Sequence, residues 1–200
     1  MEFYPVTIRR ELDITPINPL LLVSGDGSSL LNDLKWFIWQ SVDADIMAIG
    51  RSINIHADPV RHWASVDSEE LKNWAENLPG DPIRHTMGDW PWFDVDWGIK
   101  NCDIKPDDII WHGSSSLFCA YIGLAMGYEK ILLAGCPLDN NGHWYFEGLP
   151  KGLNTGPAWN NQSYDAWREF AQLPESKKVR SLSGFTAEIL GKPTEDWIIA

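Results

Sequence analysis

The chain has 200 residues, of which 44% are hydrophobic, and it carries a formal net charge of −12 at pH 7. This length suffices for a single domain, residues 1–200, with a substantial core. The acidic balance and the lack of a Lys/Arg-rich stripe exclude a general nucleic-acid binder, although one Arg and backbone amides can hold a small phosphorylated ligand. The three cysteines form no CxxC or Cys/His pattern, so neither structural zinc nor a disulfide framework is expected.

A cytoplasmic protein without a membrane span is expected. Residues 1–13 carry charges and no apolar core, which argues against a signal peptide. The apolar run 19–23 is too short to cross a bilayer. Cysteines outside any disulfide pattern favour a reducing compartment.

Strand and helix patterns alternate along the first half of the chain. Residues 20–24 (LLLVS) are a continuous apolar run, typical of a strand buried on both faces. Helical spacing follows, with Leu30, Leu34 and Phe37 on one face. This half is predicted to contain strands at 20–24, 45–49 and 62–66 and helices at 30–40 and 68–74.

The second half contains two segments that read as irregular. Residues 79–107 are predicted to form a Trp-rich insert, and 136–162 a long loop of the kind used for binding. The remaining predictions are strands at 108–111, 130–134 and 179–182 and helices at 114–126, 163–171 and 185–190, the last ended by Gly191. This alternation predicts an α/β fold with a doubly wound, mainly parallel sheet, Rossmann-like and three-layered (α/β/α).

A glycine-rich turn follows the first buried strand. In such sheets, ligands bind beyond the carboxyl ends of the strands. Gly25 and Gly27 would permit positive φ and close ligand approach, and a plain tight turn is the alternative. The predicted nucleotide-binding residues here are Gly25, Asp26, Gly27, Ser28 and Ser29.

A serine turn precedes the helix at 114–126. Gly113, Ser114, Ser115 and Ser116 would offer amides and hydroxyls to a phosphate at a helix N-terminus. The alternative is a simple N-cap, which would need only one of the three serines.

Two charged residues hold matching positions after the second and third strands. Arg51 could pair with a phosphate or carboxylate, or lie in a surface loop. Asp67 could bind a ribose hydroxyl or help to hold Mg²⁺, or cap a helix.

His143 is the predicted general base, because the ordinary histidine pKa lies near working pH. It stands in the loop after the strand at 130–134, close to Asp139. His112, beside the serine turn, is its rival, and a solvent-exposed histidine without a role is the alternative. His56, His62 and His85 show no metal-ligand spacing with one another.

The 12 tryptophans divide into two predicted groups. Core packing is expected for Trp36, Trp39 and Trp111. Those predicted to lie in irregular segments could form an aromatic wall for a sugar or base, or equally a partner surface. They are Trp90, Trp92, Trp97, Trp144 and Trp159.

The stretches LLLVSGDGSSL and HGSSSLFCAYIGLAMGYEKILLAGCPLD resemble a pattern shared by two families. These are the compact bacterial lipooligosaccharide sialyltransferases and the MptE-like 6-hydroxymethylpterin pyrophosphokinases, with many phage and prophage proteins among the similar sequences. The resemblance covers Leu20 to about Asp139. It implies a nucleotide site at both turns, His143 nearest to the sialyltransferase base, and the cytoplasm of a bacterial host for a phage-encoded protein.

The resemblance leaves two reactions open. Asp26 stands where the sialyltransferases have Asn, and a carboxylate beside a triphosphate suits bridging Mg²⁺. Asp26, Asp67 and Asp139 would then be the metal ligands, and no cofactor is otherwise expected. Glycosyl transfer from a nucleotide-sugar to a small-molecule or glycan acceptor is preferred, since neither turn holds a lysine to grip a triphosphate. A non-catalytic binding module is the third interpretation, and the oligomeric state is not predicted.

Overall fold

The computed structural model describes residues 3–9, 11–66, 80–88, 93–99, 114–139, 141–143 and 157–199, with the backbone alone for 157–162. Its elements in chain order are β1 (Phe3–Ile8), β2 (Leu20–Ser24), α1 (Leu30–Gln40), β3 (Asp45–Ile49), the 3-10 helix η1 (Gly50–Ile55), β4 (His62–Ala64), β5 (Ile83–Thr86), β6 (Val95–Ile99), α3 (Ser115–Met126), β7 (Lys130–Ala134), α4 (Pro157–Ala171), the 3-10 helix η5 (Pro174–Lys178), β8 (Val179–Ser181), α5 (Gly184–Leu190) and α6 (Glu195–Ile199).

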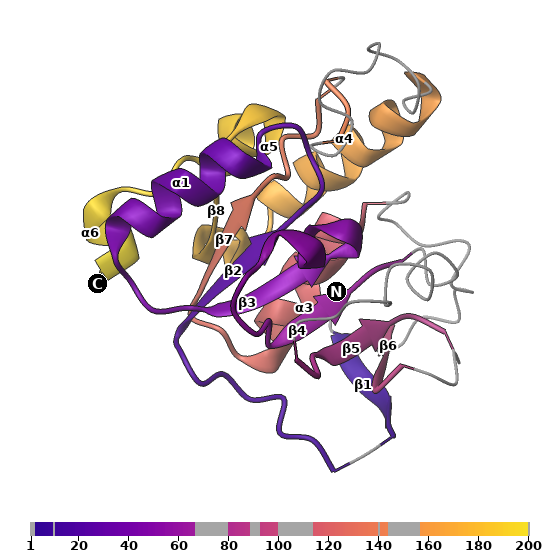
Figure 1. Ribbon diagram of the computed structural model, residues 1–200. Coiled ribbons are helices and arrows are strands. Elements are labelled where there is room, and N and C mark those ends of the chain that lie inside the picture. The colour runs from indigo at the N-terminus through magenta and orange to yellow at the C-terminus, as the bar shows by residue number, and fades with distance from the viewer. Residues whose placement is uncertain are drawn as a thin grey trace.

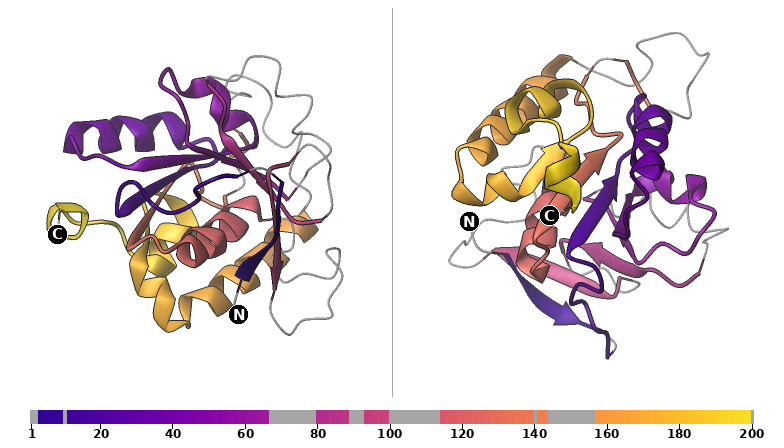
Figure 2. Two further views of the ribbon diagram at one scale, coloured as in Figure 1. Left: turned by 90° about the horizontal axis from the view of Figure 1, so that it is seen from below. Right: turned by 90° about the vertical axis from the view of Figure 1, so that its left-hand side faces the viewer.

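These strands form one sheet in the order β1-β6-β5-β4-β3-β2-β7-β8 (Figure 1). Every neighbouring pair is parallel except β1 and β6, which are antiparallel. Helix α1 covers one face, and α3 and α4 lie on the other (Figure 2). The predicted fold class, a doubly wound and mainly parallel α/β sheet, is confirmed.

The central strands β2, β3 and β7 are mostly apolar, with a polar residue only at one end, because each face of the sheet is covered. All five residues of β2 are buried. Leu21 and Val23 pack with α3, whereas Leu20 and Leu22 belong to the cluster under α1. Each fully buried Leu contributes about 1.5–3 kcal/mol through removal from water, so these strands hold both layers together.

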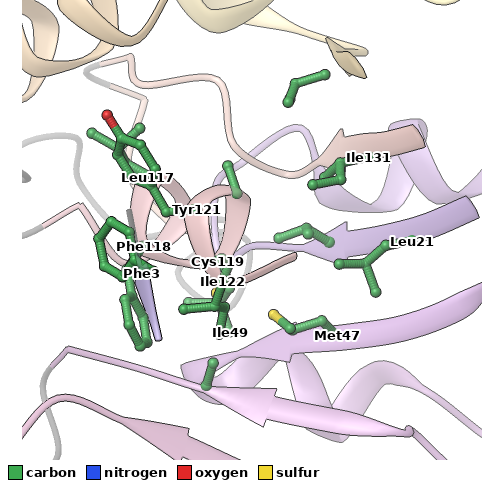
Figure 3. Packing of buried hydrophobic residues seen from close by; sticks show 14 of the residues in the cluster. Phe3, Leu21, Met47, Ile49, Leu117, Phe118, Cys119, Tyr121, Ile122 and Ile131 are labelled. Carbon is green, nitrogen blue, oxygen red and sulfur yellow. The ribbon is translucent and has the colours of Figure 1, made fainter. Parts of the chain in front are cut away.

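Helix α3 packs closely on the sheet and is buried over most of its surface. Its side chains Cys119 and Ile122 face the strands that carry Leu21 and Met47 (Figure 3). A Cβ at Gly123 would lie 2.8 Å from a methyl carbon of Leu21. The small residue therefore sets how near this helix approaches the sheet.

A chain of buried hydrogen bonds crosses β6, β5 and β4. The Trp97 indole N–H donates to His85 Nδ1 at 3.0 Å, so His85 Nε2 carries the proton and donates to His62 Nδ1 at 2.9 Å. His62 Nε2 then donates to the Tyr128 hydroxyl at 3.0 Å, and Tyr128 donates to Asp45 at 2.7 Å. Both histidines are thereby held neutral, each with its proton on Nε2.

The prediction of a Trp-rich insert at 79–107 is wrong in part. This segment supplies β5 and β6 to the main sheet, and Trp97 is a buried residue of β6 rather than a loop residue. The strands β5 (IRHT) and β6 (VDWGI) contain polar residues, so neither has the apolar pattern of a buried strand. Arg84 and Asp94 neutralise each other across this pair at 3.0 Å, which allows charged residues in buried positions.

Trp39 also departs from its prediction as a core residue, because 85% of its surface is exposed. It lies near the end of α1 on the face turned away from the sheet, with exposed Leu31 and Ile38. Trp36, on the same helix, is partly buried and packs against the core cluster under α1. Trp111 and the other predicted loop tryptophans Trp90, Trp92 and Trp144 lie outside the described residues, as does the Trp159 side chain.

Element bounds differ from the predicted ones at several places. Helix α4 begins at Pro157 rather than at 163, so the loop predicted at 136–162 ends earlier. The strands predicted at 62–66 and 179–182 end at Ala64 and Ser181, and α5 begins one residue early. Elements β1 and α6 were not predicted. The helix at 68–74 and the strand at 108–111 lie outside the described residues.

The outer strand β1 carries a proline and an irregular register. Its pairing with β6 shifts between Pro5 and Thr7. Tyr4, Val6 and Ile8 alternate along its exposed side. Among the helices that the structure describes, none combines the length and the apolar character needed to cross a bilayer.

Candidate functional site

The direction of the chain reverses between β2 and β7, the two central strands. From β2 the chain runs outward through β3 and β4 on one side, and it later returns to β7 and β8 on the other. Such a switch point opens a crevice beyond the carboxyl ends of the strands, where doubly wound sheets bind ligands. The glycine-rich turn 25–29 lies at this point.

The two glycines of the turn serve close loop packing, not positive φ. Neither Gly25 nor Gly27 is among the residues with positive φ, so that part of the prediction is wrong. A Cβ on Gly25 would lie 2.6 Å from Cys136 Sγ, and one on Gly27 2.8 Å from the Gly135 carbonyl oxygen and closer still to Pro137. The exits of β2 and β7 therefore pack backbone against backbone.

A buried carboxylate ties these two exits together. Asp33 Oδ2 accepts hydrogen bonds from Gly135 N at 2.8 Å, from Ser29 Oγ at 2.9 Å and from Ser183 Oγ at 2.7 Å. The Ser29 hydroxyl, predicted to bind a nucleotide, thus belongs to a network that joins α1, β7 and the start of α5.

Replacing Asp33 by Ala is expected to lower the free energy of unfolding by about 3 kcal/mol, because the buried Gly135 N–H loses its acceptor along with two hydroxyl bonds. Urea denaturation at constant m-value measures this loss. Asp33→Asn retains one oxygen acceptor and should lose less. Asp165→Ala is the matched control, since the Asp165–Arg168 pair is exposed and should matter little. Equal stability of the Asp33→Ala and Asp165→Ala variants would contradict the proposed tie.

The three serines before α3 have different surroundings. Ser114 is buried and caps the helix, accepting from Leu117 N at 3.3 Å and from the Trp167 indole at 3.2 Å. Ser115 and Ser116 are partly exposed. The Ser114 hydroxyl therefore has a structural role, and the hydroxyls of Ser115 and Ser116 are better placed to meet a ligand.

The first turn of α3 reaches across the carboxyl edge of the sheet. Ser115 Oγ accepts a hydrogen bond from Val66 N, just beyond β4, at 3.3 Å. Ser116 lies near the Cys136 thiol, just beyond β7: burial raises the pKa of this thiol, and the Ser116 side chain opposes the rise. Since Cys136 also lies against Gly25, Ser116 and the glycine-rich turn share this neighbour at the switch point.

Asp26 and Arg51 connect the exits of β2 and β3. The Arg51 backbone N–H donates to Asp26 Oδ2 at 3.1 Å. This bond places a carboxylate and a guanidinium-bearing residue at one edge of the site. Both are predicted ligand residues, and the structure brings them together.

His143 also reaches this turn. It forms an antiparallel bridge with Gly27, and its Nδ1 lies 3.3 Å from the Asp26 carbonyl oxygen. A carbonyl can only accept, so Nδ1 is the protonated nitrogen and Nε2 the basic one. Burial lowers the pKa of His143, the bond to Asp26 raises it and the charge of Arg51 lowers it further, with a net lowering. The imidazole is therefore neutral at pH 7.

The remaining predicted residues are not all joined to this group. Ser28 N donates to the Gly142 carbonyl at 3.0 Å, which holds the His143 loop against the turn. Asp139 accepts from the backbone and side chain of Asn141 in a local turn. Within the described residues, no group of three or more His, Cys, Asp or Glu side chains is arranged to hold a metal ion. Asp67, His112 and Gly113 lie outside that part of the chain.

One polar cluster at the same edge, formed by Ser24, Ser52 and His56, is not predicted from the sequence. Ser24, the last residue of β2, lies 2.8 Å from His56 Nε2 through its hydroxyl. Ser52 binds the same residue, donating to the Ser24 carbonyl at 2.6 Å. The available signal was the position of Ser24, which ends the predicted strand at 20–24.

No family model, curated protein or solved structure matches this chain. Because a doubly wound fold serves many activities, function has to be inferred from the chemistry of the site.

Proposed function

We propose that this protein binds a nucleotide or nucleotide-sugar at the switch point and transfers a group from it, most simply a glycosyl group, to an acceptor hydroxyl. The observation that carries the proposal is the neutral His143 imidazole, oriented by the Asp26 carbonyl within the glycine-rich turn. An oriented imidazole of lowered pKa is what general-base catalysis at neutral pH requires.

The chemistry follows from the arrangement. His143 Nε2 takes the proton of the acceptor hydroxyl. At the same time, the oxygen of that hydroxyl bonds to the transferred carbon. The bond between that carbon and the phosphate oxygen breaks, and the nucleotide leaves with its negative charge. Hydroxyls of Ser115 and Ser116 and the amides of the α3 N-terminus would stabilise this charge.

Arg51, at the exit of β3, supports the same proposal. Its backbone is fixed by Asp26, and its cationic side chain would pair with a phosphate or a sugar carboxylate. Glycosyl transfer is preferred to Mg²⁺-dependent pyrophosphoryl transfer of the MptE-like kind, because neither turn holds a lysine to grip a triphosphate.

Thermal-shift measurements with CMP, UDP and ATP, each with and without Mg²⁺, test the proposal. Stabilisation by CMP or UDP without metal is expected. Stabilisation by ATP that requires Mg²⁺ would replace glycosyl transfer by phosphoryl transfer. No response to any of the three would contradict nucleotide binding and leave a partner-binding module.

The double variant Ser115→Ala/Ser116→Ala is expected to bind the stabilising nucleotide about tenfold more weakly, because two hydroxyl donors are lost. Isothermal titration measures the dissociation constant, and urea denaturation checks that the domain stays folded. Thr15→Ala removes an exposed hydroxyl far along the chain and should leave the affinity unchanged. Equal affinity of the double variant and the wild type would discard the serine turn as a phosphate site.

A further inference from the structure

His56 is held by a network of buried hydroxyls at the carboxyl end of β2. The Ser24 hydroxyl, which is fully buried, lies 2.8 Å from His56 Nε2. Ser52, also fully buried, accepts from Ile49 N at 3.0 Å. A partly exposed histidine is thus fixed by groups that no solvent reaches, an arrangement that costs desolvation and gives orientation in return.

The protons of this network can be assigned. Ser52 has one hydroxyl proton and donates it to the Ser24 carbonyl oxygen at 2.6 Å. The Ser24 hydroxyl donates to Ser52 Oγ at 3.1 Å. The Ser24 oxygen is therefore the acceptor for His56, whose Nε2 carries the proton and whose Nδ1 carries the lone pair.

His56 Nδ1 has no hydrogen-bond partner among the residues that the structure describes. Burial lowers the pKa of this imidazole, and the nearby Asp58 carboxylate opposes the shift only in part. The ring is consequently neutral at pH 7, with an acceptor nitrogen available beside an ordered anchor.

The anchor lies directly beside the proposed nucleotide site. Ser24 immediately precedes Gly25, and His56 follows η1, whose Arg51 is bonded to Asp26. The two imidazoles thus lie at different points of the same chain segment: His56 contacts Ser24, just before the turn, and His143 contacts Asp26 and Gly27.

We infer that His56 is a ligand-binding residue of this site, whose Nδ1 accepts a hydrogen bond from an O–H or N–H group of the nucleotide. The inference rests on the proposed function and extends it. It assigns to His56 the recognition of a neutral O–H or N–H group of the nucleotide, whereas other residues bind the phosphate. The sugar hydroxyls and the exocyclic amine of a nucleotide are groups of this chemistry.

Nitrogen-15 NMR of the histidine side chains tests the inference directly. In the free protein, the His56 signals are expected to show protonated Nε2 and unprotonated Nδ1. Addition of CMP, UDP or Mg²⁺-ATP, whichever stabilises the protein, should shift the Nδ1 resonance. A proton on Nδ1 in the free protein, or an Nδ1 signal unmoved at saturation, would overturn the assignment.

Affinity measurements on variants provide a second readout. His56→Phe keeps a ring and removes both nitrogens, so nucleotide affinity should fall about tenfold. His56→Gln should retain most of the affinity, because its amide can donate to Ser24 and still present an oxygen acceptor. Asn54→Ala, an exposed residue of the same 3-10 helix, is the matched control and should bind normally.

The outcomes separate the two proposals. Nucleotide binding that is equal in the wild type and in His56→Phe overturns the role of His56 and leaves the proposed function standing. Absence of binding by the wild type to all three nucleotides overturns both. Should His56→Phe fail to fold, the NMR experiment on the wild type still decides.

Discussion

Replacing His143 by Ala is expected to slow group transfer about 10²- to 10⁴-fold, the usual contribution of a general base. Nucleotide affinity should stay within a few-fold, because the turn retains its bonds to β7 through Gly25 N and Gly27 N. The rate of nucleotide release from the sugar nucleotide that stabilises the protein measures this effect. Gln172→Ala, at an exposed position just after α4, is the control and should leave the rate unchanged.

The pH profile distinguishes a base from a merely structural histidine. Because the pKa of His143 is lowered from 6.5, the wild-type rate should be constant above pH 6.5 and should fall only when acidification protonates the ring below that value. The Ala variant should lose this acidic limb. If His143→Ala kept both the wild-type rate and the fall of the rate at acidic pH, His143 would have no part in the mechanism.

Acidification is expected to destabilise the domain steeply, through the buried pair His62 and His85. Burial lowers the pKa of His62 to about 3, with the charge of Arg61 adding to the effect, and burial likewise holds the pKa of His85 well below 6.5. The unfolded chain binds protons at both rings below pH 6.5, whereas the folded chain does not. Stability is therefore full well above pH 6.5 and is lost as pH falls toward the folded-state values, by about 4 kcal/mol between pH 7 and 5 for the pair.

Urea denaturation from pH 7 to 5 measures this loss. The variant His62→Gln removes one titrating ring, so the proton uptake on unfolding should decrease by about one near pH 5.5. NMR titration of the wild type provides a control that does not depend on a variant, since neither ring should titrate in the folded protein between pH 7 and 5. A histidine of this pair that titrates near its ordinary value would contradict the neutral hydrogen-bonded chain.

The parts of the fold that the sequence predicts best are those whose pattern is local. The bounds of β2, β3, β7 and α1 agree with the predicted ranges, because apolar runs and helical spacing report burial directly. Strands β5 and β6 were missed because His85 and Asp94 are polar and buried at once. Their partners Trp97 and Arg84 become neighbours only in the sheet, so no local pattern marks these segments as strands.

The candidate site was predictable in its location but not in the use of each hydroxyl. Ser29 and Ser114 stand beside other serines in the sequence, yet the hydroxyls of both are engaged in hydrogen bonds within the protein. Ser29 donates to Asp33 in a network shared with Ser183, 154 residues away, and Ser114 accepts from Trp167. His56 was overlooked for the same reason, because its anchor Ser24 lies 32 residues earlier. Long-range contacts decide which polar groups are left for a ligand.

The irregular outer strand has a consequence for association between copies. Proline offers no amide hydrogen, and a slipped register twists the ribbon, so Pro5 and the shift before Thr7 make β1 a poor template for an incoming extended chain. Polymerisation by strand addition is thereby disfavoured on this flank, even though Tyr4, Val6 and Ile8 present apolar surface there.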